Sequence, residues 1–560
     1  MIRLATLRKS GGKILDHFDP TGRLKRKIRD FILSNPDQDY PDYIRERVLD
    51  RASEYSVAPE SGLISFTTTV WNTPLEFLEP CVESVLSQRK FGSFEWVLLD
   101  NGSTNPEVVK YLKTLAERVS EIKYLRVEEN VGIIAGNRKC LESASGRYIV
   151  PVDSDDLLYP DVLKILTYFI KKHKYPALLF SNEDKIIDER LTEPYFKPGW
   201  DPVLFLESCY IAHLCVLDRK LAGELKIYSD SVANGSHDWN SFCQFYGRGF
   251  EPVHIPEVLY TWRMHDGSTA MNMNSKSYIS TSQLGVLQGY LRLRGIEPDL
   301  EIIPSPLFKG TPDWWIRARN RTPEKILILT NQDHSASEIA RLLGPEIQHA
   351  SYEITSLSQV FDRQNPLRVQ LKDGKFSSVV ILLKNCQTQS PWLLEWQSMR
   401  KLFPDLKVLC GKVLEGHKVF SCGAYFDLNN QAFSSPDKSR DETDPGYFAQ
   451  VWKRHSVDVP SSEFLLVEAS WLSAFLETCT SKSALRETSC DGNAELVYKL
   501  SLFAATQKGR VAYSPHIALQ VQAPIESSSI SKIEFRKGLK SYYPKVLGKT
   551  PSEYFRPVRG

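Results

Sequence analysis

Cysteine pairs, long apolar runs and nucleotide-loop motifs are all missing from this sequence of 560 residues. The ten cysteines are scattered and form no CxxC pair, which excludes a zinc ribbon and a disulfide framework. No run of 18 uncharged apolar residues occurs, so we expect no membrane span. The first twenty residues lack the apolar stretch of a signal peptide. We therefore expect a large, soluble, cytoplasmic protein with reduced thiols.

An excess of charge of either sign is also missing. The chain has 70 Lys and Arg against 68 Asp and Glu, a net charge of +2, which argues against a nucleic-acid partner. No GxGxxG follows a predicted strand and no GxxxxGK[ST] is present, which excludes a dinucleotide oxidoreductase and a P-loop NTPase. TTTVWNTPLEF follows the first predicted strand where a sugar-nucleotide pyrophosphorylase would carry a Gly-rich loop with Arg and Lys. That enzyme class is therefore disfavoured.

What is present, between residues 63 and 153, is an alternation of two periodicities. Short β-branched and aromatic runs such as LISFTTTVW predict buried strands, and segments such as PLEFLEPCVESVLSQ place apolar residues at helical spacing. Strands that alternate with helices indicate βαβ units and an α/β fold with a mixed, mostly parallel sheet flanked by helices. Ligands of such sheets bind at the carboxyl ends of the strands.

Three of the predicted strands end in polar groups, the most informative of which is DSDD. Asp153 and Asp155 stand two residues apart at the end of an apolar strand, so both carboxylates point to one side of the backbone. Such a pair can hold a hard divalent cation while leaving positions open for phosphate. The same residues could instead cap the helix that follows. Taken alone, the motif leaves both interpretations open.

The order of these motifs resembles the family-two glycosyltransferases, which are inverting enzymes of the GT-A fold that use nucleotide-sugar donors. VWNT, DNGST, ENVGIIAGN and DSDD follow one another at the family's spacing, and FSNEDKIID and GSHDWNSFCQFYGRGFEPVHIPEVLYTWRMHDGSTA continue the match. The resemblance covers residues ~60–300. The last of these stretches is similar to the subgroup that builds bacterial O-antigen, capsule and related surface polysaccharides.

The resemblance assigns roles to individual positions. It implies that Asp155 binds Mn²⁺ or Mg²⁺ as the DxD motif, and that His265 completes the metal or diphosphate shell; a loop histidine is the alternative for His265. Thr69 departs from the proline that many members carry. The resemblance implies donor binding by Thr69, Trp71, Asp100, Asn130, Arg138 and Asp153.

Asp238 in GSHDW matches the position of the catalytic base. An inverting transfer needs a carboxylate to take the proton of the acceptor hydroxyl, although Asp238 could also cap the helix that follows. The acceptor side is expected to include Glu183, Asp184 and the neighbouring His237. Three large aromatic residues fit either sugar stacking or the core: Trp200, Tyr210 and Trp239.

The second half resembles a diverged GT-A-like repeat. FSSVVILLKNCQTQSPWLLEW has the strand, turn and helix of the DxD region, but Lys384-Asn385-Cys386-Gln387 leaves no carboxylate for a metal. Asn493 and Glu495 occupy the positions of the family's acidic pair. We expect this second, degenerate GT-A-like α/β domain to bind glycan or a partner, or to support the first domain, without transferring sugar. An unrelated α/β domain is the alternative.

The expected organisation has five parts: 1–60, a basic helical segment; 61–300, the GT-A catalytic domain; 301–321, a connector; 322–525, the diverged domain; 526–560, a basic tail. The implied function is metal-dependent transfer of a sugar from a nucleoside-diphosphate donor, with UDP- or dTDP-sugars favoured, to a growing surface glycan or lipid-linked glycan. The rival is a glycan-binding or scaffold protein without catalysis. The basic runs at 23–29 and 532–549 fit either solvated helix faces or peripheral contact with anionic lipid at the inner face of the cell membrane.

Overall fold

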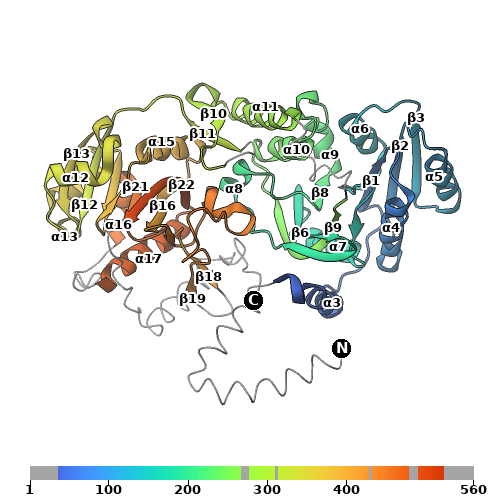
Figure 1. Ribbon diagram of the computed structural model, residues 1–560, viewed down its shortest axis with the longest axis horizontal. Helices are drawn as coiled ribbons and strands as arrows, with labels where there is room; N and C mark the ends of the chain where they lie inside the picture. Colours follow the sequence, from blue (N-terminus) through green and yellow to red (C-terminus); the bar gives the residue numbers. More distant parts are fainter. Residues whose placement is uncertain (1–35, 266–276, 309–312, 428–431, 479–489, 522–560) are drawn as a thin grey trace, which may run out of the picture.

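Two α/β units lie side by side along the long axis of the molecule in the computed structural model (Figure 1). The structure describes five stretches of chain: 36–265, 277–308, 313–427, 432–478 and 490–521. The basic runs at 23–29 and 532–549 lie outside the described residues, so lipid contact through these runs stays a prediction. Within the described part of the chain, no helix is long and apolar enough to cross a membrane.

The first unit is built on a mixed sheet of nine strands in the order β3-β2-β1-β4-β8-β6-β9-β5, with β7 paired to β6. The β1–β2, β2–β3, β1–β4 and β6–β9 pairs are parallel and the others antiparallel. Its strands are β1 (Ile64–Val70), β2 (Glu95–Asn101), β3 (Ile122–Val127), β4 (Tyr148–Pro151), β5 (Leu157–Leu158), β6 (Leu178–Ile187), β7 (Arg190–Tyr195), β8 (Cys215–Asp218) and β9 (Val253–Arg263). The predicted α/β fold class is confirmed.

Helices follow the strands as the periodicity predicts. β1 is buried along nearly its whole length, as expected for a central strand covered on both faces. Asn105 caps α5 by accepting a hydrogen bond from the amide of Glu107, and Pro106 opens that helix. The helices of this unit are α4 (Leu75–Leu86), α5 (Pro106–Arg118), α6 (Ile133–Ser143), α7 (Val162–Lys172), α8 (Pro202–Glu207), α9 (Arg219–Glu224), α10 (His237–Tyr246) and α11 (Ser277–Leu293).

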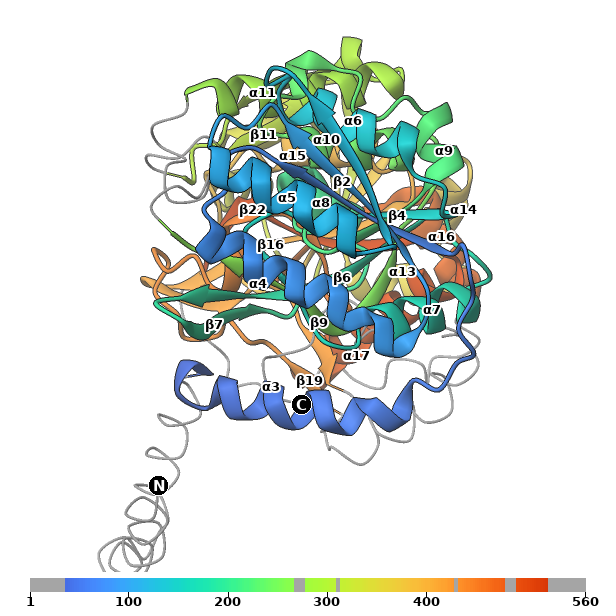
Figure 2. The ribbon, with the colours of Figure 1, turned by 90° about the vertical axis from the view of Figure 1, so that its right-hand side faces the viewer.

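Helix α3 (Pro36–Glu54) precedes the predicted boundary at residue 61 but packs on the first unit (Figure 2). Arg51 is fully buried and its guanidinium bonds both oxygens of Asp161 at 2.9 and 2.6 Å. Arg51 also lies 3.3 Å from a carboxylate oxygen of Glu257 on β9. A buried guanidinium needs such partners because an unpaired charge is costly to desolvate. Residues 36–54 therefore pack as part of the first unit.

The second unit repeats the strand pairing of the first. Its sheet has the order β13-β12-β14-β21-β16-β22-β15, with β17 on β16 and β20 on β22. Pair for pair, parallel and antiparallel contacts match β2-β1-β4-β8-β6-β9-β5 with β7 on β6. The repeat has no described counterpart of β3. Its strands are β12 (Glu324–Thr330), β13 (Ala350–Ser356), β14 (Ser378–Leu382), β15 (Cys386–Gln387), β16 (Leu406–Glu415), β17 (Lys418–Ser421), β20 (His455–Ser456), β21 (Phe464–Glu468) and β22 (Arg510–Val521).

This shared topology gives the second unit the GT-A-like architecture that the sequence predicts. A small hairpin of β18 (Tyr425–Asp427) and β19 (Ala432–Ser434) is added to it. Its helices are α12 (Ala336–Leu343), α13 (Leu357–Phe361), α14 (Pro366–Lys372), α15 (Trp392–Leu402), α16 (Ala469–Thr478) and α17 (Cys490–Thr506). The side chains at 493 and 495 lie outside the described residues, so the prediction for that pair stays open.

The predicted connector contains two paired strands. β10 (Leu300–Pro304) pairs antiparallel with β11 (Trp314–Ala318). The indole Nε1 of Trp315 donates to Glu395 on α15 at 2.9 Å, and the amide of Ala318 donates to Ser398 at 2.8 Å. The pattern of Pro and basic residues pointed to a linker, whereas buried tryptophans attach this segment to both units: Trp315 bonds to Glu395, and Trp314 donates to Gln283 on α11 of the first unit at 3.1 Å.

Buried charges join the two units. Arg454 of the second unit is 1% exposed, forms two 2.7 Å bonds to Glu395, and lies 3.6 Å from Glu207 at the end of α8. Nearby, Asp201 accepts hydrogen bonds from the amide and hydroxyl of Ser456 at 2.7 and 2.8 Å. One hydrophobic cluster also runs continuously from β2 of the first unit to β22 of the second. These contacts fix the two units as one body.

Candidate active site

The carboxyl ends of β1, β2 and β4 meet at one edge of the first sheet. Val70 is the partner of Asp100 across β1 and β2, and Thr67 is the partner of Pro151 across β1 and β4. The loops beyond these strands consequently touch. The hydroxyls of Thr73 and Ser154 are 2.7 Å apart, which brings the VWNT and DSDD segments together as the sequence predicts.

The metal residues named by the sequence are in contact. β5 pairs antiparallel with the end of β9, and this pairing returns His265 to the DSDD loop. The imidazole Nε2 of His265 lies 2.9 Å from Oδ2 of Asp155, and its ring stacks on Phe77 with centroids 4.5 Å apart. Asp155 and His265 are both partly exposed. A carboxylate and an imidazole are therefore presented together at the strand ends.

The third carboxylate of the motif has a structural contact. Asp156 is 1% exposed, and accepts hydrogen bonds from the Tyr260 hydroxyl at 2.6 Å and the Arg263 amide at 2.8 Å. Burial raises the pKa of Asp156 well above its usual range. Asp156 thus holds the DSDD loop to β9, and only Asp153 and Asp155 face outward.

Asp153 lies in the electrostatic field of the other candidate groups. Its side chain is exposed at the surface of the loop. Desolvation by the surrounding protein raises the pKa of Asp153, and the carboxylates of Asp155 and Asp238 raise it further, while His213 and His237 oppose that rise. Charges act on one another in this way only at short range, so five groups from three segments of the chain form one site.

His213 is a member of this site that the sequence analysis missed. Its amide donates to Glu183, and its ring stacks on Tyr260 with centroids 5.1 Å apart. The sequence offered only a lone histidine within the apolar run CYIAHLCV. His213 is far from DSDD in the sequence, and the pairing of β4 with β8 that brings the two segments together leaves no local pattern.

Asp238 lies in the first turn of α10, on the exposed side of the helix end. The residue at the N-terminal cap is Ser236, and no side chain forms a capping hydrogen bond there. The nearest charged partner of Asp238 is His237, whose Nε2 lies 3.6 Å from Oδ1. Trp239 is 4% exposed and donates to the carbonyl of Phe205 at 3.1 Å in the core. The Asp238 carboxylate is thus left facing the site, while Trp239 belongs to the core.

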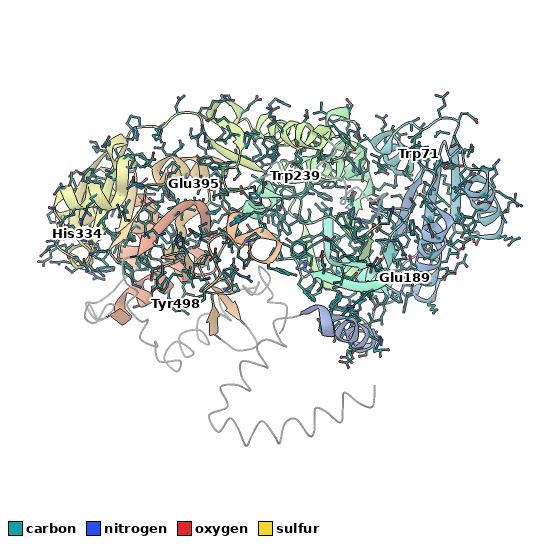
Figure 3. The ribbon with its side chains drawn as sticks, in the orientation of Figure 1. Trp71, Glu189, Trp239, His334, Glu395 and Tyr498 are labelled. Carbon is teal, nitrogen blue, oxygen red and sulfur yellow. The ribbon has the colours of Figure 1, made fainter. Side chains whose placement is uncertain are left out.

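The predicted donor residues line the same edge. Trp71 is 55% exposed at the end of β1 and lies at the outer side of the first unit (Figure 3). Thr69 donates to Asn137 on α6 at 2.9 Å. Asn130 accepts a hydrogen bond from Asn101 at 3.1 Å, which ties the loop before α6 to the end of β2. Arg138 is half-buried on α6.

Asp100, the residue predicted to bind the nucleobase of the donor, is enclosed by protein groups. It is fully buried and accepts hydrogen bonds from the Ser103 amide at 2.9 Å and from Tyr124 at 3.3 Å. Arg126 on β3 forms an ion pair with Oδ2 of Asp100, the oxygen that also accepts from Tyr124. A nucleobase that bonds to Asp100 would therefore share the carboxylate with Arg126. The sequence analysis did not single out Arg126.

Glu183 and Asp184 are turned inward. Glu183 is 7% exposed and pairs with the buried ammonium of Lys197 at 3.1 Å. Asp184 is fully buried and accepts hydrogen bonds from Tyr40 of α3 and from Tyr159. Alternation along β6 and the docking of α3 cover these side chains. Their burial does not fit the predicted position on the acceptor side.

The second unit has a lysine at the position of the first carboxylate. In the second sheet, Leu382 at the end of β14 is the partner of Phe464, the first residue of β21. In the first sheet, β4 pairs with β8 so that Ile149 faces Leu217, and the same register brings Pro151 opposite the start of β8. Lys384 stands two residues beyond Leu382, as Asp153 stands two beyond Pro151. Its ammonium lies 3.0 Å from Oε1 of the buried Glu463. A cation is therefore built into the repeat where the first unit has Asp153.

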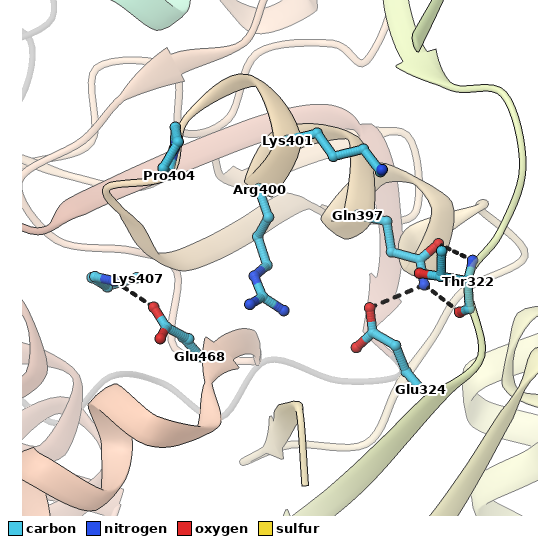
Figure 4. A pocket seen from close by; sticks show the side chains of 8 residues that line it. All are labelled: Thr322, Glu324, Gln397, Arg400, Lys401, Pro404, Lys407 and Glu468. Atoms are coloured by element: carbon cyan, nitrogen blue, oxygen red, sulfur yellow. Dashed lines mark hydrogen bonds and ion pairs between the residues drawn. The ribbon is translucent and has the colours of Figure 1, made fainter. Parts of the chain in front are cut away.

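A hollow of about 370 Å³ lies at the opposite edge of the second sheet, around Arg400 of α15 (Figure 4). Two carboxylates line it, and each has a partner: Glu468 pairs with Lys407, and Glu324 accepts from Gln397 at 3.0 Å. Glu324 begins β12, at the amino end of the parallel strands, so this hollow is separate from the site described above.

No group of three or more His, Cys, Asp or Glu side chains suited to a metal ion occurs among the residues that the structure places. Asp155 and His265 together offer two protein ligands. A bound diphosphate and water can supply the remaining ligands of an ion. Mg²⁺ in phosphate sites is commonly held by one or two protein groups together with substrate oxygens. The residues present therefore fit such an ion.

Comparison with known proteins identifies the class of the first unit. Residues 65–225 match the family described as Glycosyl transferase family 2. Among curated proteins, the chain is 30% identical over 295 residues to "Uncharacterized protein y4gI" of Sinorhizobium fredii, covering 52% of this chain and 32% of that protein. It is 26% identical to "O-antigen biosynthesis protein RfbC" of Myxococcus xanthus, covering 49% and 22%.

A shorter relative matches over most of its length. Glycosyltransferase EpsE of Bacillus subtilis is 27% identical over 241 residues, which are 42% of this chain and 84% of that protein. By contrast, the chain spans about a third or less of the first two relatives. A solved structure of S. aureus TarS 1–349 is similar at 15% identity, with 42% of this chain and 71% of that chain covered and a TM-score of 0.33.

Proposed function

We propose that the protein is an inverting, metal-dependent glycosyltransferase that moves a sugar from a nucleoside-diphosphate donor to a growing bacterial surface glycan. The observation that carries this proposal is the contact of His265 with Asp155 at 2.9 Å, beside Asp153 and within the electrostatic reach of Asp238. All four belong to the part of the chain that resembles family-two transferases. Their convergence at the carboxyl ends of parallel strands is where ligands bind in such sheets.

The proposed reaction uses Asp238 as general base. Its carboxylate accepts the proton of the acceptor hydroxyl as that oxygen attacks the anomeric carbon from the side opposite the diphosphate. The new glycosidic C–O bond forms while the bond to the leaving diphosphate oxygen breaks, and the diphosphate departs with the electron pair. The partial exposure of Asp238 supports this role because an acceptor can reach it.

Asp155 and His265 are the residues that would hold Mn²⁺ or Mg²⁺. Such an ion neutralises negative charge on a leaving diphosphate when it is bound. Trp71 offers an exposed ring for the nucleobase. Asn130 in the loop before α6 and Arg138 on α6 would bind the donor phosphates and ribose. An aspartate such as Asp100 suits the N3–H of uracil or thymine, so we favour UDP- or dTDP-sugars as donors.

The surface-glycan acceptor is supported by the names of the relatives. RfbC is named for O-antigen biosynthesis, and TuaG of Bacillus subtilis, 26% identical over 216 residues, is named for teichuronic acid biosynthesis. A lipid-linked or polymeric acceptor of this kind places the enzyme in the cytoplasm, at the inner face of the cell membrane. Anionic lipid there would attract the basic runs at 23–29 and 532–549.

One working site is proposed for the whole chain. The ion pair between Lys384 and Glu463 supports this, because an ammonium at that position disfavours a divalent cation. The second unit then supports the first through the buried contacts of Arg454 or binds glycan. The rival function is a scaffold or glycan-binding protein without catalysis, and it requires the Asp153, Asp155, Asp238 and His265 cluster to be idle.

The test is release of nucleoside diphosphate from a panel of UDP-, dTDP- and GDP-sugars in the presence of Mn²⁺. Release from one donor that is lost in Asp238→Asn supports a transferase and identifies the sugar. Donor binding without release, measured by calorimetry, indicates that the acceptor is missing from the assay. A protein that binds none of the donors contradicts the proposal and favours the scaffold.

A further inference from the structure

Two exposed apolar side chains flank the segment that leads into Asp238. Val232 is 54% exposed in the short turn before α10, and Tyr278 is 46% exposed in the first turn of α11. Exposed apolar surface near a site commonly marks a binding surface. Neither group is enclosed in the core, because about half of each faces solvent.

Glycines seat both side chains closely against the neighbouring element. Gly235 has a φ of +86°, and a Cβ added there would lie 2.8 Å from Cε2 of Tyr278. A Cβ added at Gly285 would lie 2.3 Å from Cγ1 of Val232. The ring of Tyr278 therefore lies directly on the backbone of the turn, and Val232 lies directly on α11. Both groups are held in place with their outer faces free.

Tyr278 is close to the proposed base. Gly235, which it contacts, is three residues before Asp238, a span of at most about 11 Å of chain. The hydroxyl of Tyr278 makes no hydrogen bond to any residue within the described ranges. A tyrosine in this state offers a flat apolar face and a polar tip to a ligand. This position suits the sugar ring that carries the acceptor hydroxyl, which Asp238 would deprotonate.

We propose that Tyr278 is the platform on which the acceptor glycan rests, with Val232 seated against α11 about two turns further along that helix. The occupant is a neutral pyranose residue, whose C–H face packs on the Tyr278 ring while a neighbouring hydroxyl reaches Asp238. This inference rests on the proposed function, because it assigns the acceptor side of that site. Tyr278 takes the acceptor-side role that the sequence analysis gave to Glu183 and Asp184, because those two side chains are buried.

The experiment measures sugar binding without a donor. Maltotriose and chitotriose are each mixed with the full chain, and saturation-transfer NMR records contact with the sugar C–H protons. We expect contact in the wild type and in Tyr278→Phe, which keeps the ring. Tyr278→Ala should weaken binding about tenfold, as loss of an aromatic contact does. Tyr43→Ala is the matched control, since Tyr43 is also 46% exposed and lies on α3.

Three results would overturn the platform. They are equal sugar contact in the wild type and Tyr278→Ala, no contact with either trisaccharide in the wild type, and an equal loss in Tyr43→Ala. A change of oligomeric state in Tyr278→Ala, seen by light scattering, would instead assign the surface to a protein partner. Failure of the proposed function is distinguishable, because it appears as absent donor binding while this measurement needs no donor.

Discussion

The imidazole of His265 lies 2.9 Å from the carboxylate of Asp155, although 110 positions separate them in the chain. The contact follows from the antiparallel pairing of β5 with the end of β9, which returns the chain to the DSDD loop. It joins two residues that the sequence assigns to one ion, and it connects the strand-end motifs with the segment that follows Asp238.

Asp155→Ala and His265→Ala should each weaken Mn²⁺-dependent donor binding, because each removes half of the protein's ligand pair. We expect the Mn²⁺-induced rise in melting temperature with UDP to shrink in both variants. Differential scanning fluorimetry with and without Mn²⁺ measures it. Glu117→Ala, at an exposed carboxylate on α5, is the control and should respond as the wild type does. A full Mn²⁺ response in both site variants would show that the ion binds elsewhere.

Asp238→Asn should lower the turnover number about 10²- to 10⁴-fold while leaving donor affinity close to wild type, because an amide cannot accept the acceptor proton. Nucleoside diphosphate release and calorimetry measure the two quantities. Asp218→Asn is the matched control: Asp218 caps α9, where asparagine caps as well as aspartate. Unchanged turnover in Asp238→Asn would remove this residue from the chemistry.

Lys384→Gln should leave turnover within about twofold of the wild type, because the second unit lacks the metal carboxylate and the substituted amide can still bond Glu463. The same release assay measures it. A large drop in turnover, with an unchanged melting temperature, would indicate that the second unit takes part in the reaction.

Arg51→Ala should cost about 3–5 kcal/mol of unfolding free energy, since it leaves the buried Asp161 without its ion-pair partner, whereas Glu257 keeps Arg47. Urea unfolding measures the loss. Arg45→Ala removes a solvent-exposed pair with Asp42 and should change stability little. Equal effects of the two variants would mean that α3 does not stabilise the first unit.

Asp184→Asn should flatten the pH dependence of stability between about pH 4 and 6. Burial raises the pKa of Asp184 to about 6. The folded state therefore binds a proton that the unfolded state releases near its ordinary pKa, so this group's contribution to stability is present below that pKa and is lost as pH rises to about 6. Unfolding free energy measured across that range in both proteins checks the sign. An unchanged slope in the variant would show that another group titrates there.

The alternation of strands and helices was readable from sequence because residue periodicity is local. β1 and α4 form where ISFTTTV and the spaced apolar residues of LEFLEPCVESVL predict them. The strand-end polar motifs follow from the same reading, since a parallel sheet brings carboxyl ends to one edge. The second α/β unit was also expected, because the repeat keeps the order of its segments.

Long-range pairing decided the rest. His213 joins the site through the pairing of β4 with β8, and α3 covers Asp184, and neither contact leaves a local pattern in the sequence. The connector has the composition of a linker, yet Trp315 attaches it to Glu395.

The sequence by itself determined the fold class and the chemical groups of the site, because periodicity and residue type are properties of short segments. Only the tertiary structure decided which carboxylates face the site and which are buried. Asp155 and Asp156 are adjacent in sequence, yet one faces outward and the other is held by Tyr260 and the Arg263 amide. Burial depends on which elements pack together, and that is settled by contacts between distant parts of the chain.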